Sequence, residues 1–415
     1  MTDLRELAVQ AKEAARVLAG ASEERKNRAL ENISDALLRH QDEILAANRA
    51  DCDAARADGM SDAMLDRLTL TGARLERMAA AVRKVRDLPD PVGEVMEERV
   101  LENGLQLSKV RVPLGVVGII YESRPNVTVD AAVLCLKSGN AAFLRGGSES
   151  IRSNIALERV MREALAQSGL PQNAVTLVHD TSRETASQMM QLRGLIDVLI
   201  PRGGAGLIAA VVRSASVPVI ETGTGNCHVY VHEKADLRMA VDIIVNAKAQ
   251  RVSVCNAAET LLVDEAVADN FLPMAQKALS ASGVVLRGCE RTRAILEGAA
   301  PADDDDWARE YLDYILAVRV VQGLDEAISH IARYSTGHSE CIVTQDAEAA
   351  ARFLREIDAA AVYHNASTRF TDGEEFGMGA EIGISTQKMH ARGPMGLREL
   401  CSYKYIVRGS GQIRL

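Results

Sequence analysis

Cys255 is the side chain of this sequence best suited to nucleophilic chemistry. It lies in the segment QRVSVCNAAETLLV, residues 250–263, after a predicted helix and before a predicted strand. A cysteine in such a junction, beside the small polar residues Ser253 and Asn256, can meet solvent and ionise, and the thiolate is the reactive form. Cys135, in the apolar run AAVLCLKSG, is expected to be buried and inert instead. Many loop cysteines have no function, so the assignment depends on the other segments.

Two glycine-rich turns could hold phosphate groups. In RGGSES, residues 145–150, Arg145 offers a guanidinium and Ser148 a hydroxyl, a pair able to bind a ribose 2′-phosphate or simply to form a solvated turn. In PRGGAG, the glycines Gly203 and Gly204 allow a ligand to approach the N–H groups that open a helix, although forming a tight turn is the more common role of such glycines. Neither GxGxxG nor GxxxxGKS follows any predicted strand, so the usual dinucleotide and P-loop signatures are absent.

The sequence predicts no metal site. His228 and His232 have the i, i+4 spacing of zinc ligands on a helix, but the intervening Val-Tyr-Val favours a strand. On a strand two residues so spaced are about 13 Å apart. The acidic run 303–306 lacks the alternating spacing of a calcium loop and is expected to be a solvated surface loop.

Composition excludes several classes of partner. The 415 residues carry a formal net charge of −9 and no basic block, which argues against binding to nucleic acid or an anionic membrane. No run of 18 apolar residues occurs and the N-terminus lacks a signal-peptide pattern, so a cytoplasmic protein is expected. The seven cysteines are scattered without a CxxC pair and are expected to be reduced thiols.

The elements that must position these residues form a helical layer and two α/β series. Residues 3–88 predict several amphipathic helices, with Ser22 and Ser61 as N-caps. From Val116 onward, short β-branched runs alternate with helices and predict a doubly wound parallel sheet. These runs are VVGIIY (116–121), AAFLR (141–145), VTLVH (175–179), IDVLI (196–200) and VPVIE (217–221).

A second series predicts another α/β domain. It contains the strands HVYVH, ETLLVD, CIVTQD and AAVYHN, and it begins near His228. The segments 103–112 and 402–409 alternate polar and apolar residues, which indicates an antiparallel ribbon. An isolated ribbon is marginally stable, so we expect it to pack on another subunit.

Four stretches together resemble the aldehyde dehydrogenase superfamily and, within it, the branch that reduces L-glutamate 5-phosphate. The PN pair and the SGNA turn occur across the superfamily, whereas YESRPNVT, LRGGSE and HARGPMGL are typical of this reductase branch. The stretches are VPLGVVGIIYESRPNVTVDAA (112–132), SGNAAFLRGGSES (138–150), QRVSVCNAAETLLV (250–263) and EFGMGAEIGISTQKMHARGPMGLREL (375–400).

The resemblance implies a fold and its domains. It is the aldehyde dehydrogenase-like α/β fold, with two doubly wound parallel-sheet domains plus a β-hairpin oligomerisation element. Residues 1–98 and 115–228 would form the NADP-binding domain with its N-terminal helical layer. Residues 229–399 would form the catalytic domain, and residues 99–114 and 400–415 the hairpin.

The resemblance also implies roles for individual residues. Asn126 matches the side-chain donor of an oxyanion hole and Cys255 the nucleophile. Arg145 and Ser148 match the turn that receives the adenosine ribose, and the loop with Gly203 and Gly204 lies near the pyrophosphate. Glu310 resembles the glutamate that holds the nicotinamide ribose, although the stretch before it is shorter than in ordinary family members.

The implied reaction is the NADPH-dependent reduction of L-glutamate 5-phosphate to L-glutamate 5-semialdehyde, a step of proline biosynthesis. An anionic substrate in an acidic protein needs local cations. The candidates are Arg124, Arg251, His390 and Arg392, each of which could instead pair with a surface carboxylate. Further copies of the chain are expected partners, and a glutamate 5-kinase is a candidate partner.

Two other functions stay open at this point. A hydrolytic aldehyde dehydrogenase would use a glutamate to activate water, and Glu221 lies 255 − 221 = 34 residues before the nucleophile. However, this chain reads ETGTGN where hydrolytic members have a Glu-Leu-Gly-Gly pattern, so we expect Glu221 not to be an essential base. The other alternative is a catalytically silent NADP-binding protein, against which the presence of both Cys255 and Asn126 argues.

Overall fold

The protein is described by a computed structural model that covers residues 3–122 and 124–414. The chain forms two compact units. The first unit comprises Met1–Glu221, Met378–Gly383 and Met395–Leu415, and the second comprises Thr222–Gly377 and Ile384–Pro394. Residues 378–383 and 395–399 therefore pack with the first unit, whereas the family resemblance implied that they belong to the catalytic domain.

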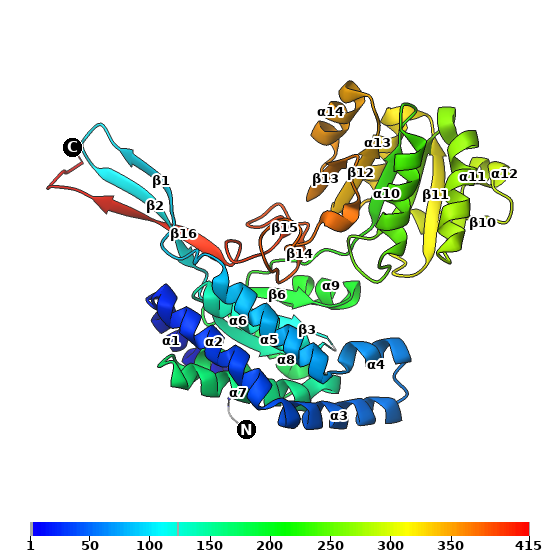
Figure 1. Ribbon diagram of the computed structural model, residues 1–415. Helices are drawn as coiled ribbons and strands as arrows, with labels where there is room; N and C mark the ends of the chain where they lie inside the picture. Colours follow the sequence, from blue (N-terminus) through cyan, green and yellow to red (C-terminus); the bar gives the residue numbers. More distant parts are fainter. Residues whose placement is uncertain (1–2, 123, 415) are drawn as a thin grey trace. The chain divides into compact units, whose positions relative to one another are not determined.

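The first unit begins with the expected helical layer (Figure 1). Ser22 caps α2 by accepting a hydrogen bond from the Arg25 N–H, as predicted, whereas Ser61 precedes α4 without a side-chain capping bond. The helices are α1 (Leu4–Ala19), α2 (Glu23–Arg39), α3 (Gln41–Ala57), α4 (Asp62–Leu68) and α5 (Gly72–Asp87).

A four-stranded parallel sheet forms the centre of the first unit, in the order β5-β4-β3-β6. Its strands are β3 (Val116–Tyr121), β4 (Ala141–Arg145), β5 (Val175–Leu177) and β6 (Val198–Arg202). The helices between and after them are α6 (Pro125–Lys137), α7 (Ile151–Gln167), α8 (Arg183–Met190) and α9 (Ala205–Ser214). Helices α6 and α7 pack with α2, α3 and α5, while α1 and α9 pack with α8, so both faces of the sheet are covered.

The predicted fifth strand, VPVIE, is the one strand of this series that does not form. Only Val219 makes an isolated parallel bridge, to Leu199 of β6. Pro218 has no N–H to donate to a ladder, and proline in a sheet is confined to edges and bulges. The segment therefore touches the edge of the sheet and leaves it before Glu221.

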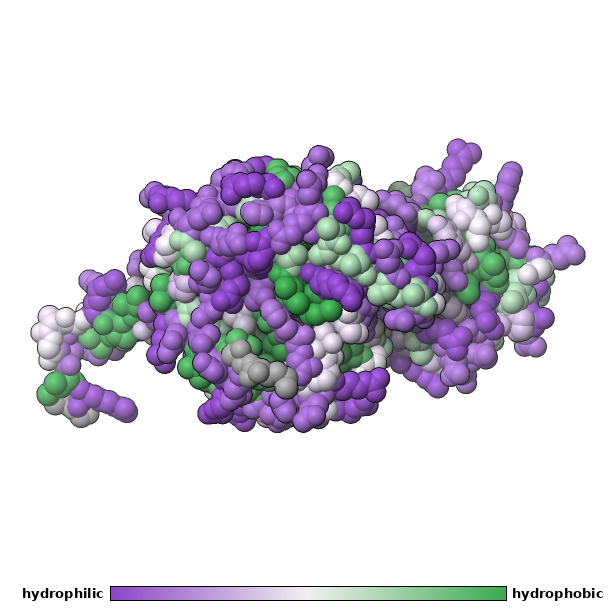
Figure 2. All heavy atoms as spheres, turned by 90° about the horizontal axis from the view of Figure 1, so that it is seen from below, coloured by the Kyte–Doolittle hydropathy of each residue, from purple (hydrophilic) through white to green (hydrophobic). Residues whose placement is uncertain are grey.

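The predicted ribbon is present and has a third strand. Strands β2 (Gln106–Pro113) and β16 (Cys401–Arg408) pair antiparallel along their whole length, and β1 (Val95–Val100) pairs with the other edge of β2. The sequence VMEERV of β1 does not alternate in polarity, and all six of its residues are exposed, so periodicity could not reveal it. Figure 2 shows apolar side chains, in green, on this three-stranded sheet at the left of the view.

The second unit contains a seven-stranded parallel sheet in the order β10-β9-β11-β8-β7-β12-β13. The strands are β7 (Cys227–Val231), β8 (Ala258–Asp264), β9 (Val285–Gly288), β10 (Ala300–Pro301), β11 (Ile315–Val321), β12 (Ser339–Val343) and β13 (Ala361–His364). A small antiparallel pair consists of β14 (Ile384–Ser385) and β15 (Gly393–Pro394).

Helices cover both faces of this sheet (Figure 1). On one face α10 (Leu237–Ala249), α11 (Glu265–Ala281) and α12 (Glu290–Ile295) pack over the larger apolar core, which includes Leu261, Phe271 and Leu316. On the other face α13 (Gly323–Tyr334) and α14 (Ala347–Glu356) cover a smaller core. Among the described helices, none is both long and apolar enough to cross a membrane.

Candidate active site

Cys255 lies at the edge of the second unit's sheet where the strands begin. It belongs to the turn between α10 and β8, and its side chain is partly exposed, whereas Cys135 is fully buried as predicted. The segments that precede β7 and β12 reach the same edge because the three strands are adjacent and parallel. A short turn after a helix can present a thiol at this edge, because it is held by the fully buried strand that follows.

Two neighbours from the start of β7 fix the backbone of Cys255. Gly225 packs so tightly that a β-carbon at that position would lie 1.4 Å from the Cys255 carbonyl oxygen. The Cys227 thiol donates a hydrogen bond to the same oxygen over 3.2 Å. Burial raises the pKa of Cys227 well above its ordinary value, so this thiol stays protonated and available as a donor.

Arg369, which sequence reasoning missed, brings a cationic group to the nucleophile turn. Its Nε donates to the Gln250 side chain over 2.9 Å and its Nη1 donates to the Asn256 side chain. Burial lowers the pKa of Arg369 and nearby Arg251 lowers it further, while the thiol of Cys255 opposes both. A guanidinium group near a thiol favours the thiolate. No local spacing could have revealed this, since Arg369 lies 113 residues beyond its partner Asn256.

Glu310 also reaches this edge of the sheet. Its Oε1 accepts the Gly225 N–H over 2.7 Å, so the carboxylate holds the glycine that packs on Cys255. Burial raises the pKa of Glu310, and the hydrogen bond from Gly225 and the charge of Lys248 oppose that shift. The structure therefore brings the predicted residue Glu310 to the nucleophile turn.

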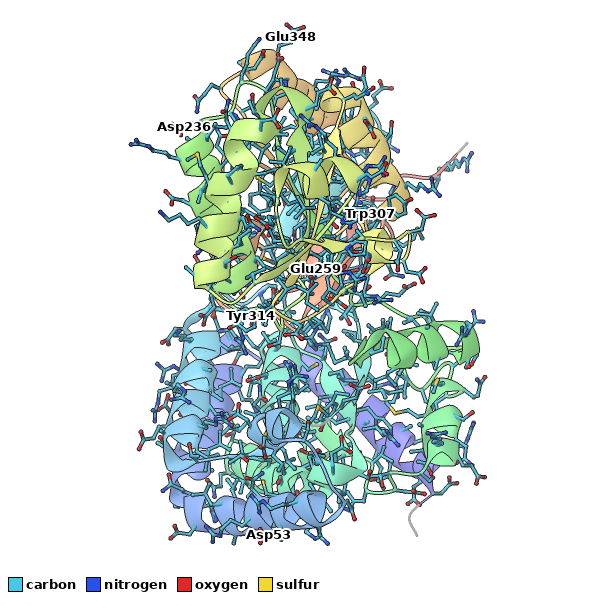
Figure 3. The ribbon with its side chains drawn as sticks, turned by 90° about the vertical axis from the view of Figure 1, so that its right-hand side faces the viewer. Asp53, Asp236, Glu259, Trp307, Tyr314 and Glu348 are labelled. Carbon is cyan, nitrogen blue, oxygen red and sulfur yellow. The ribbon has the colours of Figure 1, made fainter. Side chains whose placement is uncertain are left out.

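A fully buried ion pair lies behind Glu310. The Lys248 Nζ is 2.5 Å from the Glu259 Oε2, and both side chains have no exposed surface. Figure 3 labels Glu259 within the second unit, with Trp307 and Tyr314 on the segment that also carries Glu310. Burial raises the pKa of Glu259 to about 7, with Lys248 as the main opposing charge.

The other predicted cations differ in their surroundings. Arg392 pairs with the exposed carboxylate of Asp358 over 2.7 Å, which is the alternative left open by the sequence. His390 is exposed and adopts a left-handed backbone conformation, with φ of 67°. Arg124 is exposed at the N-cap of α6 in the first unit. Arg251 lies near Arg369, whose charge interacts with the Cys255 thiol.

Asn126 occupies the first turn of α6, directly after Pro125 at the start of the helix. Its side chain is exposed, and the Nδ2 donates to the Asp130 Oδ2 over 3.0 Å. Burial raises the pKa of Asp130 to about 6, and the bond from Asn126 opposes that shift. The Asp130 carboxyl thus orients the Asn126 amide one turn along the helix.

The turn after β4 is built by close packing. A β-carbon on Gly146 would lie 2.3 Å from the Asn154 side chain, so the turn has no room for a larger residue. The Arg145 Nη2 donates to the Thr181 and Ser182 carbonyl oxygens. Its buried Nε has no partner among the described residues. Ser148 is exposed beside it, so this turn keeps both an exposed hydroxyl and an unsatisfied guanidinium nitrogen.

The loop between β6 and α9 contains Gly203 and Gly204, and both lie close to the Glu122 side chain. The Gly204 N–H, at the start of α9, donates to the Glu122 carboxylate over 3.2 Å. A β-carbon on Gly203 would lie 2.6 Å from the Glu122 carboxyl carbon, so a larger residue there would require the exposed Glu122 side chain to move. The N–H that binds a carboxylate here is chemically suited to a phosphate oxygen.

A cavity in the first unit does not contain these residues. It has a volume of about 910 Å³ and lies in the first unit, at the sheet edge formed by β5. It is lined by side chains of α1, α7 and the segment after β5. Two of these residues, Glu158 and His179, are hydrogen-bonded, with 2.8 Å between the His179 Nε2 and the Glu158 Oε2. None of the predicted catalytic or cofactor-binding residues is part of its lining.

His228 lies on strand β7, as the Val-Tyr-Val pattern predicted, and bonds to the Glu340 carboxylate over 3.0 Å. The centroid of its ring lies 5.5 Å from that of the His330 ring. Within the described part of the chain, no cluster of three His, Cys, Asp or Glu residues has the arrangement of a metal site.

Comparisons with known proteins agree with this architecture. The aldehyde dehydrogenase family model matches residues 1–287. The gamma-glutamyl phosphate reductase of Carboxydothermus hydrogenoformans is 59% identical over 414 residues, covering 100% of both chains. That of Caldanaerobacter subterraneus subsp. tengcongensis is 57% identical, covering 98% of both.

A solved structure extends the similarity to three dimensions. The crystal structure of gamma-glutamyl phosphate reductase from Thermotoga maritima has a TM-score of 0.97 and 52% identity, covering 99% of each chain. The predicted aldehyde dehydrogenase-like α/β fold is thereby confirmed. The chain belongs to the aldehyde dehydrogenase family, and within it to the branch of the gamma-glutamyl phosphate reductases.

Proposed function

We propose that this protein reduces L-glutamate 5-phosphate to L-glutamate 5-semialdehyde and phosphate, using NADPH, as a step of proline biosynthesis. The observation that carries the proposal is the partly exposed Cys255 thiol, whose charge interacts with the Arg369 guanidinium. The names of the relatives at 57–59% identity support the same substrate.

The first half of the reaction is acyl transfer to Cys255. The thiolate attacks the acyl carbon, the bond from that carbon to the phosphate oxygen breaks, and phosphate leaves with its electron pair. Because an acyl phosphate has a good leaving group, the thioacyl enzyme forms readily and divides one difficult step into two easier ones. Arg369 stabilises the thiolate before attack.

Negative charge gathers on the acyl oxygen during this attack. The Asn126 amide, oriented by Asp130, and the Cys255 backbone N–H are the proposed donors to it. Each donor in such a hole contributes about 3 to 4 kcal/mol of transition-state stabilisation. Gly225 and Cys227 support this role of Cys255 indirectly, because they contact its carbonyl oxygen and so restrict the backbone of the turn.

Family membership implies a nicotinamide cofactor, and the residues present fit one. A β-carbon on Gly204 would meet no atom within 4 Å, the Gly204 N–H already binds a carboxylate, and the Arg145 Nε is buried without a partner among the described residues. We assign Gly203 and Gly204 to the pyrophosphate, Arg145 and Ser148 to the 2′-phosphorylated ribose, and Glu310 to the nicotinamide ribose. When bound, NADPH supplies the hydride that reduces the thioacyl carbon.

The aldehyde is released when the reduced carbon expels the Cys255 thiolate. Water would waste the activated substrate at the thioacyl stage, so a reductase gains nothing from a general base there. This agrees with the ETGTGN sequence at Glu221, which departs from the hydrolytic pattern. We therefore assign Glu221 no essential role in deacylation.

The remaining substrate contacts and the partners are part of the same proposal. We assign Arg124, His390 and Arg392 to the anionic ends of the substrate, with Arg392 leaving Asp358 when substrate binds. The β1-β2-β16 sheet exposes Val100, Tyr403 and Tyr405, a surface suited to pairing with a second copy of the chain. We place the enzyme in the cytoplasm, where a glutamate 5-kinase would supply its labile substrate.

The reverse reaction tests the function directly. Purified protein is incubated with glutamate 5-semialdehyde, NADP and phosphate, and NADPH formation is followed while each component is omitted in turn. We expect formation to require phosphate. Oxidation without phosphate, with release of free glutamate, would instead indicate the hydrolytic reaction, and absence of any turnover would indicate a silent binding protein.

Cys255→Ser tests the nucleophile in the same assay. A serine hydroxyl without an adjacent base stays protonated at neutral pH, so turnover should fall to at most a few per cent of the unsubstituted rate. Cys289, also partly exposed, provides the matched control, and Cys289→Ser should retain activity. Substantial turnover by Cys255→Ser would rule out the thioacyl route.

A further inference from the structure

A continuous series of contacts connects the buried pair Lys248–Glu259 to the backbone of Cys255. Lys248 lies in the last turn of α10, and Glu259 is the second residue of β8. The two residues therefore lie on either side of the turn that carries the nucleophile. Both side chains are fully buried and their charged atoms are 2.5 Å apart. Removing two charges from water costs free energy, and the attraction between them often does no more than offset that cost. We therefore looked for a role of this ion pair other than stabilising the fold.

The second carboxylate oxygen of Glu259 is bonded to a strained residue. Its Oε1 accepts the Leu312 N–H over 3.1 Å. Leu312 has φ of 54°, a left-handed conformation that is unfavourable for a residue with a β-carbon. Its side chain is 41% exposed, so apolar burial does not compensate for this conformation. The hydrogen bond to the buried carboxylate therefore selects it.

The conformation of Leu312 determines where Glu310 lies, two residues earlier in the same irregular segment. The Gly225 N–H donates a hydrogen bond to the Glu310 Oε1 over 2.7 Å, and Gly225 packs directly on the Cys255 carbonyl oxygen. Lys248 acts on Glu310 as well, because its charge favours the ionised carboxylate. The series of contacts thus runs from Glu259 through Leu312, Glu310 and Gly225 to Cys255.

We propose that Glu259 is a positioning residue for the nucleophile, and that it acts by holding Leu312 and hence Glu310 against Gly225. Lys248 compensates the buried charge of Glu259 and favours the ionised form of Glu310. Neither residue touches the reacting atoms. The inference deepens the proposed reductase function, because it concerns the same thiol, but its first measurement needs neither substrate nor cofactor.

Two double variants separate the hydrogen bond from the charge. Lys248→Met with Glu259→Gln removes both charges and keeps an oxygen that accepts the Leu312 N–H. Lys248→Met with Glu259→Leu removes the same charges and also that acceptor, with a side chain of similar size. Since the two proteins differ only at the acceptor, a difference between them reports on the contact with Leu312.

The first readout is the alkylation rate of Cys255 by iodoacetamide, measured by peptide mass spectrometry on free protein. We expect the Gln variant to stay within about threefold of the unsubstituted rate and the Leu variant to change it about tenfold, as small displacements of reacting groups do. In semialdehyde oxidation, kcat should fall about tenfold or more only in the Leu variant, with KM for the semialdehyde little changed.

A merely structural role would give a different pattern. In that case both variants would shift the melting temperature while alkylation and kcat stayed equal in the two proteins, and the inference would be overturned. Equal losses in both variants would overturn it as well, because charge rather than the acceptor would then be responsible. Lys26→Met, at a buried ion pair of the first unit, is the control and should leave Cys255 alkylation unchanged.

The outcomes also separate this inference from the proposed function. If the unsubstituted protein oxidises no semialdehyde but the two variants differ in Cys255 alkylation, the reductase assignment fails and the positioning role stands. If the reductase reaction is confirmed and alkylation is the same in both variants, the function stands and the positioning role is wrong.

Discussion

The backbone of Gly225 lies directly against the carbonyl oxygen of Cys255, closer than any side chain would allow. A β-carbon at position 225 would be 1.4 Å from that oxygen and 2.7 Å from the Cys255 α-carbon. Both atoms belong to the backbone, so neither can rotate away. The nucleophile turn is therefore compatible only with glycine at this position.

Gly225→Ala should displace the nucleophile and destabilise the second unit. We expect kcat for semialdehyde oxidation to fall about 10²-fold, since displacements near 1 Å have that effect, together with a lower melting temperature. Gly72→Ala is the matched control, because a β-carbon there makes only an ordinary contact, at 3.6 Å from Gln41. Normal activity in Gly225→Ala would show that the turn can rearrange without cost.

Asn126→Ala should lower kcat about 10²-fold with little change in cofactor affinity, as the loss of one oxyanion donor does. The same substitution also removes the bond from Asn126 to Asp130. Asp130→Asn separates the two effects, because its amide oxygen still accepts that bond, and it should retain most of the activity. An unchanged kcat in Asn126→Ala would place Asn126 in a structural role.

Arg145→Ala should weaken NADPH binding about tenfold to a hundredfold, which corresponds to the loss of a charge-assisted hydrogen bond, and NADH binding much less. Since Arg145 also holds the Thr181 and Ser182 carbonyls, thermal unfolding must be measured alongside titration with each cofactor. Equal losses of affinity for both cofactors would mean that Arg145 supports the loop without reading the 2′-phosphate.

His330 should make the second unit sensitive to acid. Burial lowers the pKa of His330 to about 2, and neither ring nitrogen has a partner among the described residues. Below the unfolded pKa near 6.5 the unfolded chain binds a proton that the native state does not, so stability falls as pH falls. Between pH 7 and pH 5 this loss amounts to about 2 kcal/mol.

His330→Phe tests this pH dependence, because it keeps an aromatic ring against Trp307 and Tyr334 and removes the titrating group. Urea unfolding at pH 7 and pH 5 should show a smaller loss of stability in the variant, by about 2 kcal/mol. His364→Gln, at an exposed imidazole, is the control. If acid destabilises His330→Phe as much as the unsubstituted protein, other groups cause the effect.

Elements and motifs could be predicted because they depend on neighbours in the chain. The strands 116–121 and 141–145 form with the predicted bounds, and β2 and β16 pair as expected from their alternation. The exceptions have local physical causes. Pro218 cannot support the predicted strand at 217–221, and β1 carries no alternation by which it could be recognised.

The sequence alone determined the two α/β series, the antiparallel ribbon and the position of Cys255 between a helix and a strand. Only the tertiary structure decided what surrounds that thiol. Arg369 reaches Asn256 across 113 residues because strand order, not spacing, brings their segments together. Lys248 and Glu259 look like ordinary surface charges in the sequence, and they become a buried pair only when the sheet is assembled, because burial depends on contacts that local patterns do not encode.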